Sequence, residues 1–458
     1  MIVRPHMAPG ESSVWYANFW KFVSVYLNHH YAKNYCLSAE NSIDIHTKSP
    51  TIPEQIIVIV SRGGGVPITL PFRTSMFPYK DPRNLPEERV EIDGLQIMEL
   101  GYALCKATPT FFGKYPQQAE IALRLIRSPD QLLIPIFKHA FQASAARLIG
   151  AYQFLNDHAM ADGLISGLQN FGVNIKPEIP FVHSAPLTIS RAISPHAARI
   201  SSMWSTYREL ILKVLPNPSK QHMSSKECLS AIDEIYKQDA YNSLSIEGYD
   251  VDQQLIDKVR NNHWNPDLYA DDSETRNGLA ARGYYEAFKE VKKSLLKMLD
   301  GADPVETLER DLSKWYQNLF APSVRAGILK PTDVLGYRKS PVYIRNSRHI
   351  PLSKDALLDA MEAFFFCLKS EAHPAVRAIL GHFIFVYIHP YMDGNGRIGR
   401  FLMNSMLVSG GYPWTIVKLV NRSEYLSTLE IASVDHDIVP FATFILKEML
   451  SSTSSSRN

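Results

Sequence analysis

The chain has 458 residues, with 48 Lys and Arg against 46 Asp and Glu, which gives a formal net charge of +2. Its hydrophobic share of 45% is ordinary for a globular protein and excludes the disordered, fibrous and membrane-spanning classes. Because the net charge is close to zero, the overall composition indicates neither nucleic acid nor an anionic membrane as the partner. At about 150 residues per domain, this length predicts two or three domains.

The four cysteines, Cys36, Cys105, Cys228 and Cys367, lie far apart in the sequence and form no CxxC pair. This spacing argues against a zinc ribbon or a thioredoxin-like site and predicts reduced thiols. The N-terminal residues lack the apolar core of a secretory signal, and no apolar run reaches the roughly 18 residues that span a bilayer. We therefore expect a cytoplasmic protein that has no membrane partner.

The N-terminal 110 residues predict an α+β region. A serine-capped apolar pattern predicts a helix over 14–27, and β-branched or proline-containing runs predict strands over 56–60 and 66–72. Three glycines at 63–65 separate these two strands. Since no phosphate-loop motif frames them, the glycines are interpreted as a hairpin turn.

The remaining chain is predicted to be mainly helical. Helices are expected over 117–126, 130–154, 201–215, 228–236, 251–262, 276–299, 304–320, 354–370, 374–388, 396–409, 422–433 and 438–450, with a linker over 216–225 and a β-hairpin over 340–351. We therefore divide the chain into an α+β recognition or regulatory region (1–110), a helical segment with the linker (111–220), an all-helical domain (221–450) and a disordered tail (451–458).

One window, HPYMDGNGRIGR over 389–400, has the backbone pattern of an anion site. Pro390 ends the preceding apolar helix, because proline cannot continue it. Gly394, Asn395 and Gly396 tolerate positive φ, so their backbone N–H groups can converge on an anion. The next helix begins near Arg397 and directs its positive N-terminal dipole to the same place.

The side chains of this window supply the charged groups that phosphate chemistry needs. Arg397 and Arg400 are three residues apart and share one helix face. His389 supplies an imidazole, a group that ordinarily titrates near neutrality, and Asp393 offers the hard oxygen that Mg²⁺ takes beside phosphates. The window therefore predicts a polyphosphate cradle with a base and a metal ligand, as phosphoryl or nucleotidyl transfer requires.

This window resembles the signature of the Fic family, HPFx[D/E]GNGRxxR, with Tyr391 in place of the usual Phe. The segment that includes Val342, Tyr343 and Ile344, directly after Gly336-Tyr337-Arg338, resembles the family's flap, which holds a target segment by strand-like pairing. The resemblance covers about half of the chain. It implies a mainly α protein, in which an all-helical Fic domain with a small β-hairpin flap follows the α+β region.

The resemblance implies AMP transfer from ATP to a hydroxyl side chain (Tyr, Ser or Thr) of a protein target, with release of pyrophosphate. His389 would deprotonate the target hydroxyl, and Asp393 would hold Mg²⁺ between the α and β phosphates. Residues 394–396 would bind the phosphates, while Arg397 and Arg400 would neutralise the β and γ phosphates. ATP and Mg²⁺ are therefore the expected substrate and cofactor.

A second motif, Ser243 to Gly248, resembles the [S/T]xxxE[G/N] inhibitory motif of the same family. Ser243 and Glu247 would share one face of a helix near 236–248, and Gly248 suits its C-cap. Glu247 would pair with Arg400, deny this arginine to the γ-phosphate and crowd the productive ATP pose. The resemblance therefore implies intramolecular inhibition.

The N-terminal half carries no catalytic motif, and its residues 37–60 faintly resemble the regulator domain of abortive-infection-type antitoxins. This resemblance implies DNA or target binding, while a recognition domain for a protein partner and a homodimer stay open. Two functions are compatible with the whole sequence: an autoinhibited adenylyltransferase, or an antitoxin-like regulatory protein that holds nucleotide. Within the enzyme class, Glu247 could instead position a water that removes AMP, or another phosphate-containing group could be transferred.

Overall fold

The chain forms two compact units in the computed structural model, which describes residues 12–87, 89–181, 194–215, 224–261, 263 and 272–455. The N-terminal unit comprises Met1–Thr206 and the short segment Tyr343–Ile350, and the C-terminal unit comprises Tyr207–Val342 and Pro351–Asn458. Most of the linker expected over 216–225 lies outside the described residues.

The N-terminal unit contains two small sheets. The larger has the strand order β1 (Tyr35–Leu37), β2 (Gln55–Val60), β4 (Ser75–Lys80) and β3 (Ile68–Thr69). β2 runs parallel to β4, while β1 and β3 pair antiparallel at the two edges. β5 (Arg89–Ile92) and β6 (Leu95–Met98) form a separate antiparallel pair.

The glycines at 63–65 do not form the predicted hairpin turn. β2 and β3 are not neighbours, because β4 lies between them. Since parallel strands need a crossover connection, the chain between β2 and β4 returns along the sheet before it enters β4. The three glycines, with φ values of 68°, 84° and 91°, turn the chain at the start of this connection.

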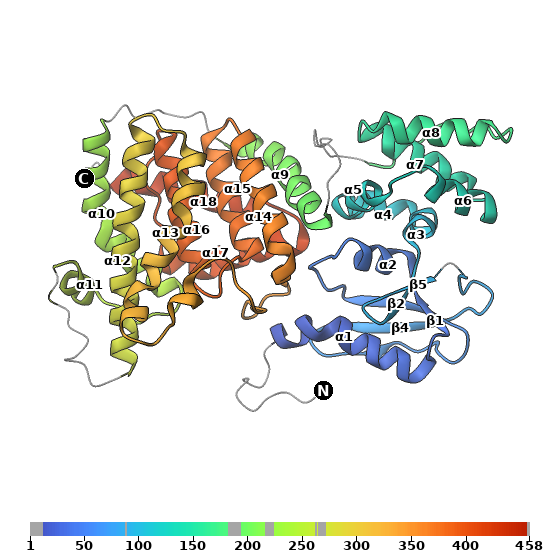
Figure 1. Cartoon of the computed structure of the whole chain (residues 1–458), viewed down its shortest axis with the longest axis horizontal. Helices are drawn as coiled ribbons and strands as arrows, with labels where there is room; N and C mark the ends of the chain where they lie inside the picture. The colour runs from blue at the N-terminus through green and yellow to red at the C-terminus, as the bar shows by residue number, and fades with distance from the viewer. Residues whose placement is uncertain are drawn as a thin grey trace. The chain divides into compact units, whose positions relative to one another are not determined.

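Helix α1 (Ser12–Tyr31) packs on the larger sheet (Figure 1). Phe19, Val23 and Leu27 recur at helical spacing and belong to one buried cluster with Ile56 and Val58 of β2. Every second residue of β2 is buried, as expected of a strand with one face on a core. The predicted α+β character of this region is confirmed.

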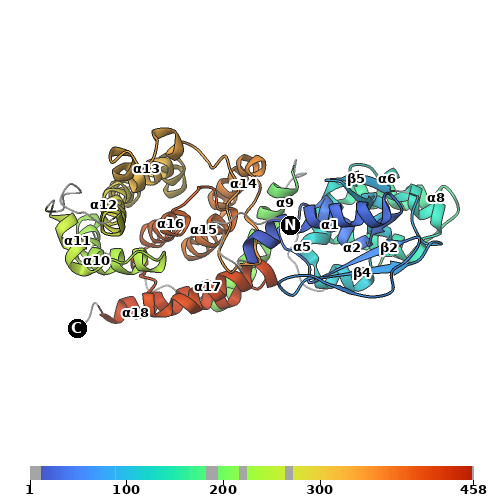
Figure 2. The ribbon, with the colours of Figure 1, turned by 90° about the horizontal axis from the view of Figure 1, so that it is seen from below.

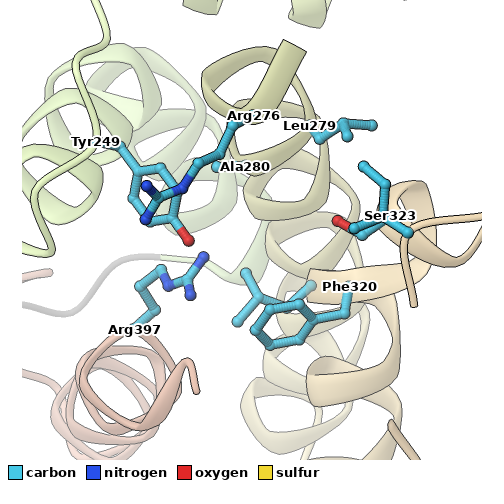
Figure 3. Close-up of a pocket in the computed structure, with 9 residues that line it drawn as sticks. Tyr249, Arg276, Leu279, Ala280, Phe320, Ser323 and Arg397 are labelled. Carbon is cyan, nitrogen blue, oxygen red and sulfur yellow. The ribbon is translucent and has the colours of Figure 1, made fainter. Parts of the chain in front are cut away.

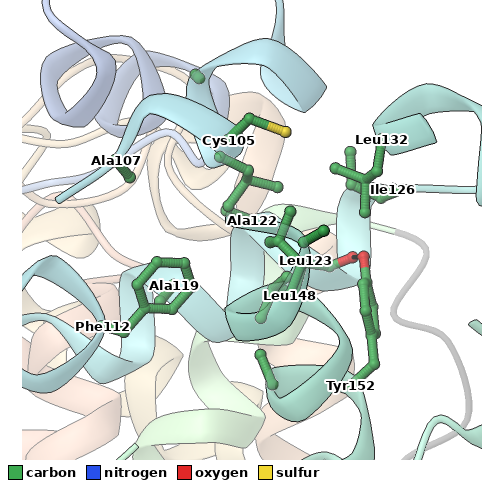
Figure 4. Close-up of a cluster of buried hydrophobic side chains, with 14 of the residues drawn as sticks. Cys105, Ala107, Phe112, Ala119, Ala122, Leu123, Ile126, Leu132, Leu148 and Tyr152 are labelled. Atoms are coloured by element: carbon green, nitrogen blue, oxygen red, sulfur yellow. Dashed lines mark hydrogen bonds between the residues drawn. The ribbon is translucent and has the colours of Figure 1, made fainter. Parts of the chain in front are cut away.

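Short helices complete the N-terminal unit: α2 (Ala39–His46), α3 (Leu100–Lys106), α4 (Pro109–Lys114), α5 (Pro116–Leu125), α6 (Asp130–His139), α7 (Gln142–Phe154) and α8 (His158–Gln169). Their aliphatic side chains, among them Ala122, Leu123 and Leu148, form a second buried cluster (Figure 4). The single helix predicted over 130–154 is two helices, because Ala140 adopts a left-handed φ of 54° and ends α6.

The C-terminal unit is built from helices. Its elements are α10 (Ser225–Ile246), α11 (Gln253–Arg260), α12 (Asp272–Leu299), α13 (Pro304–Arg325), α14 (Leu357–Ser370), α15 (Pro374–Ile388), α16 (Asn395–Ser409), α17 (Arg422–Glu430) and α18 (Val439–Ser455), and α9 (Pro195–Val214) spans the division between the units. α15 and α16 lie side by side inside this group (Figure 2). Nearly all residues of α15 are buried, which explains why its sequence is apolar on every side.

The β-hairpin predicted over 340–351 is not formed. Residues 341–344 form no strand, and the β contact of this segment in the described chain is an isolated bridge between His349 and Thr51. Ile350 also donates its backbone N–H to Pro50 O over 3.3 Å. Pro341 and Pro351 bracket the segment and lack the N–H groups that a hairpin ladder needs, so residues 343–350 pack in the N-terminal unit instead of pairing with one another.

The last helix is longer than the sequence predicted. α18 continues to Ser455, so residues 451–455, which were expected to be disordered, are helical. Residues 456–458 lie outside the described residues. Across the described ranges, no helix combines the length and the apolar character that a membrane crossing demands.

The four cysteines are free thiols. Cys36 and Cys105 are buried, and burial raises the pKa of each thiol to about 12. Both side chains therefore behave as small apolar groups of the core rather than as nucleophiles.

Candidate active site

The window 389–400 begins where α15 stops at a left-handed residue. His389 is the C-cap of α15, with φ 55° and ψ 60°, and its Nδ1 lies 3.1 Å from Val386 O. Because a carbonyl oxygen only accepts, Nδ1 carries the proton and Nε2 keeps the lone pair of a base. Burial lowers the pKa of the His389 imidazole to about 4, so the ring is neutral at pH 7.

Asn395 fastens the loop between α15 and α16. Its Oδ1 accepts the backbone N–H of Tyr391, and its Nδ2 donates to Tyr391 O, both over 2.9 Å. The ring of Tyr391 stacks on Tyr316 of α13, with centroids 3.7 Å apart and planes 5° apart. The Asn395 side chain therefore sets the shape of the loop, and the aromatic ring in place of the signature Phe anchors it in the core.

The N-terminus of α16 lies at the end of this loop. Gly394 is the N-cap with φ 81°, a conformation that favours glycine. The first-turn N–H groups of a helix have no partner within the helix and attract anions. A Cβ at Gly396 would lie 2.2 Å from Glu247 Oε1, so the Glu247 carboxylate packs directly on the first turn of α16. A carboxylate thus occupies the place that the sequence assigned to a phosphate.

Arg397 is buried between two aromatic rings. Its guanidinium lies 5.1 Å from the ring centroid of Tyr249 and 5.3 Å from that of Phe320 (Figure 3). Nη2 pairs with Asp393 Oδ2 at 3.1 Å, and the Asp393 side chain is 60% exposed while that of Arg397 is 1% exposed. The buried Nε of Arg397 has no hydrogen-bond partner in the described part of the chain. This guanidinium therefore keeps donor capacity for an anion.

Arg400 is held by the end of α10. Its Nε donates to Ser243 Oγ and its Nη2 to Ser243 O, both over 2.9 Å. Nη2 also pairs with Glu247 Oε1 at 2.7 Å. Burial lowers the pKa of the Arg400 guanidinium, but Glu247 together with Tyr425 and Tyr284 raises it above the usual value. Arg400 is therefore a fixed cation whose Nε and Nη2 donate to Ser243 and Glu247.

The end of α10 is shaped by a C-terminal cap. Gly248 has φ 85° and donates its N–H to Ser245 O over 3.0 Å, and Tyr249 donates its N–H to Leu244 O over 3.2 Å. These two bonds are the Schellman pattern that glycine at this position permits. The cap places Glu247 against Arg400 and Tyr249 against Arg397, so one helix end contacts both arginines of the window.

Arg338 is a buried residue beside His389 that no sequence pattern separates from its neighbours in the predicted flap. It is 5% exposed. Its guanidinium donates to His389 O over 2.8 Å, to Ser340 O over 3.1 Å and to Leu352 O, and its backbone N–H donates to Pro390 O over 2.9 Å. Arg338 therefore connects His389, whose backbone is left-handed, by hydrogen bonds to both ends of the 340–351 segment. No local pattern marks it, because its burial depends on segments distant in the sequence.

The flap residues are placed differently from the other predicted site residues. His389, Asp393, Arg397 and Arg400 lie with Ser243 and Glu247 in the C-terminal unit. Val342 ends a segment of that unit, while Tyr343 and Ile344 belong to the N-terminal unit, and Tyr343 is 45% exposed. A cavity of about 570 Å³ opens beside the loop within the C-terminal unit, with Met392, Asp393 and Tyr337 in its wall.

The sequence model of the Fic/DOC family matches residues 306–407 of this chain. The proteins named protein adenylyltransferase Fic from Drosophila virilis and Drosophila melanogaster are 30% identical to it over 228 residues, which is 49% of this chain and 43% and 42% of theirs. The protein of the same name from Drosophila mojavensis is 39% identical over 123 residues, 26% of this chain and 24% of that protein. The chain therefore spans less than half the length of these curated relatives.

Two solved structures are also similar to the chain. Fic-1 (residues 134–508) from C. elegans has 18% sequence identity and a TM-score of 0.42, covering 74% of this chain and 92% of that one. A Fic family protein from Desulfovibrio desulfuricans has 21% identity and a TM-score of 0.39, covering 59% of this chain and 77% of that one.

Proposed function

We propose that this chain, whose residues 306–407 are a domain of the Fic/DOC family, is an autoinhibited protein adenylyltransferase. It moves AMP from ATP to the hydroxyl of a Tyr, Ser or Thr on a protein target and releases pyrophosphate. The supporting observation is that one loop and one helix turn combine a neutral imidazole, a helix N-terminus and two buried guanidiniums. A base and a polyphosphate site are the two parts that this reaction needs.

His389 is the proposed base. The target hydroxyl gives its proton to Nε2, and its oxygen forms a bond to the α phosphorus. The bond from the α phosphorus to the bridging oxygen breaks, and the electron pair leaves with pyrophosphate. The bond between Nδ1 and Val386 O supports this role, because it leaves Nε2 unprotonated. The lowered pKa supports it as well, since a neutral ring can accept a proton at pH 7.

Asp393 is the proposed ligand of Mg²⁺. No group of three or more His, Cys, Asp or Glu side chains that could hold a metal occurs among the described residues. Mg²⁺ does not require one, because it keeps several waters and takes one or two carboxylates together with substrate phosphates. The Asp393 carboxylate, 60% exposed at the edge of the anion site, fits that preference. Bound there, Mg²⁺ would neutralise charge on the α and β phosphates.

The remaining residues of the window bind the polyphosphate in this proposal. The backbone of 394–396 at the start of α16 receives phosphate oxygens, and Arg397 and Arg400 neutralise the β and γ phosphates. Glu247 inhibits because its carboxylate lies against Gly396 and pairs with Arg400 at 2.7 Å. A γ-phosphate would meet an anion there and would find Arg400 already paired.

The target segment docks on residues 342–344 in this proposal. These residues form no regular secondary structure and have no ladder partner in the described chain. Backbone without a ladder partner is the surface that a peptide uses when it adds a strand, with main-chain hydrogen bonds that do not depend on the peptide's sequence. The absence of a preformed hairpin therefore leaves the docking edge open.

The test is labelling with ATP that carries its label on the α-phosphate. We expect Glu247→Gly to label itself or a lysate protein well above the wild type, and His389→Ala in that background to abolish the label. Asp250→Gly, which removes an exposed carboxylate just beyond the helix cap, serves as the matched control and stays at the wild-type level. Label that persists without His389 contradicts the proposal, and ATP binding without transfer would indicate a nucleotide-holding regulatory protein instead.

A further inference from the structure

A second, smaller cavity of about 370 Å³ lies beside Arg397 in the C-terminal unit. Its walls come from Tyr249 after α10, Arg276 near the start of α12, and Phe320 and Ser323 of α13 (Figure 3). The other wall residues are Leu279, Ala280, Leu319 and Ile328. Among the described residues that line it, the two arginines carry charge and none is acidic. The cavity is therefore complementary to an anion.

The two arginines converge on one ring. The guanidinium of Arg397 lies 5.1 Å from the ring centroid of Tyr249, and that of Arg276 lies 5.2 Å from the same centroid. Two cations around one ring repel each other, and the electron-rich face of the ring offsets only part of this repulsion. An anion between them would offset the rest.

Both arginines have donors left for a ligand that enters the cavity. Arg397 uses Nη2 on Asp393 at 3.1 Å, and its buried Nε has no partner in the described part of the chain. Arg276 forms no ion pair with another described residue. Because a buried donor without an acceptor costs free energy, the empty Nε of Arg397 indicates a ligand that the cavity is built to hold.

The cavity adjoins the proposed active site. It shares Tyr249, Arg276, Phe320, Ser323 and Ile328 with the larger cavity, whose wall includes Asp393. Pyrophosphate that is released beside Asp393 can therefore pass Arg397 and reach Arg276. A volume of about 370 Å³ is roughly a dozen times the share of one water in the liquid, which leaves room for a diphosphate and several waters.

We propose that this cavity binds the inorganic pyrophosphate that adenylyl transfer releases, with Arg276 as a phosphate ligand outside the signature window. The inference rests on the proposed function, because that reaction produces the pyrophosphate when the bond from the α phosphorus to the bridging oxygen breaks. Arg276 and Arg397 then donate N–H groups to its oxygens from two walls of the cavity.

The test is calorimetric titration of the full chain with sodium pyrophosphate, and separately with AMP, which lacks the terminal phosphates. Arg276→Gln removes the charge at an exposed helix position, so we expect it to fold and to bind pyrophosphate about tenfold more weakly. Its affinity for AMP stays unchanged. Arg276→Lys keeps the charge and retains most of the affinity, and Lys293→Gln, an exposed cation further along α12, changes neither titration.

Two results would overturn the site: equal pyrophosphate affinity in Arg276→Gln and wild type, or an equal loss of pyrophosphate and AMP binding. Labelling by the Glu247→Gly variant is measured separately, so the two proposals fail independently. If labelling is absent while pyrophosphate binding depends on Arg276, the transferase proposal is rejected and the anion site is supported. If labelling is present while Arg276→Gln leaves pyrophosphate binding unchanged, the transferase proposal is supported and the pyrophosphate site is rejected.

Discussion

The carboxylate of Glu247 lies 2.7 Å from the guanidinium of Arg400, although 153 positions separate the two residues in the sequence. The Arg400 side chain is 5% exposed and that of Glu247 is 29% exposed, so the pair is shielded on the arginine side and open on the carboxylate side. Ser243 supplies two further acceptors to Arg400. Nε and Nη2 of Arg400 are therefore matched with acceptors while its buried Nη1 has no partner in the described part of the chain, and an anion that replaces Glu247 must supply an equivalent acceptor to Nη2.

The first prediction separates the charge of Glu247 from its shape. Glu247→Gln keeps the size of the side chain and removes the charge that faces the γ-phosphate. We expect this variant to bind ATP at least tenfold more tightly than the wild type, and Glu247→Gly to gain more, because like charges a few ångströms apart repel strongly near a protein interior. Calorimetric titration with ATP measures both, with Asp250→Asn as the control. Equal affinity in Glu247→Gln and wild type would mean that crowding, rather than charge, inhibits.

The second prediction concerns pH. The pKa of His389 is lowered to about 4, chiefly by burial, so the neutral base is fully present at pH 7. The transfer rate of Glu247→Gly should therefore stay level from about pH 8 down to about pH 5 and fall below that as the ring gains a proton. Initial rates of labelling, measured across this pH range, show where the transfer rate begins to fall. A rate that already falls near the ordinary imidazole pKa of 6.5 would contradict the assignment.

The third prediction concerns Arg338, which we expect to position His389. Its guanidinium donates to His389 O over 2.8 Å, and its positive charge also contributes to the lowered pKa of the imidazole. In the Glu247→Gly background, Arg338→Met should lower kcat with little change in KM for ATP. The fall of the transfer rate at acid pH should begin at a higher pH.

Arg338→Lys is the matched variant, because it keeps the charge and loses the fork that reaches several carbonyls. Arg338→Lys should lower kcat without shifting the pH at which the transfer rate falls. If the pH at which the rate falls is unchanged in Arg338→Met, or shifts equally in both variants, then Arg338 has only a structural role. Thermal melting of both variants tests whether the fold is retained.

The sequence predicted the site best where the chemistry is local. His389, Asp393 and the two arginines fall in one window whose glycines and helix start fix their relative positions, so twelve residues specify most of the geometry. Glu247 was accessible too, because a helix end followed by Gly248 is a local pattern. By contrast, Arg338 and Tyr249 act through contacts with segments distant in the chain, which no local spacing encodes.

The fold was predicted less completely. Helical periodicity located the helices of the C-terminal half, but a left-handed Ala140 that splits a helix has no sequence signal comparable to glycine. The run at 340–351 has strand-like composition and still forms no hairpin, because its backbone groups find partners in Pro50 and Thr51. DNA binding by the N-terminal half and homodimer formation stay predictions.

The fourth prediction is a coupling between Gly396 and Glu247. A Cβ at position 396 would lie 2.2 Å from Glu247 Oε1, so Gly396→Ala forces the carboxylate away and strains its pair with Arg400. We expect Gly396→Ala to destabilise the wild type by about 1–3 kcal/mol, as overpacking does. In Glu247→Gly the closest obstacle is absent, and the Arg400 Nη1 atom, 3.2 Å from such a Cβ, loses its neighbouring carboxylate and can shift. Alanine within a helix should then be neutral or stabilising by about 0.5 kcal/mol. A double-mutant cycle from urea unfolding measures the coupling, and additive effects would contradict it.

The fifth prediction concerns Asn395, whose side chain satisfies the backbone N–H and C=O of Tyr391. Asn395 is 2% exposed, so water cannot replace these bonds. Asn395→Ala should therefore destabilise the protein by about 2–6 kcal/mol, because two buried groups lose their partners at about 1–3 kcal/mol each. Asn395→Asp keeps the acceptor for the Tyr391 N–H, and its neutral carboxyl can also donate an O–H to Tyr391 O, whereas the ionised carboxylate cannot. Its cost in urea unfolding should therefore be smaller at a pH where the carboxyl is neutral than where it is ionised. Labelling in the Glu247→Gly background should fall in both variants, since the loop that carries Asp393 loses its fixed shape. Unchanged labelling with reduced stability would show that the Asn395 bonds hold the fold without setting the geometry of the site.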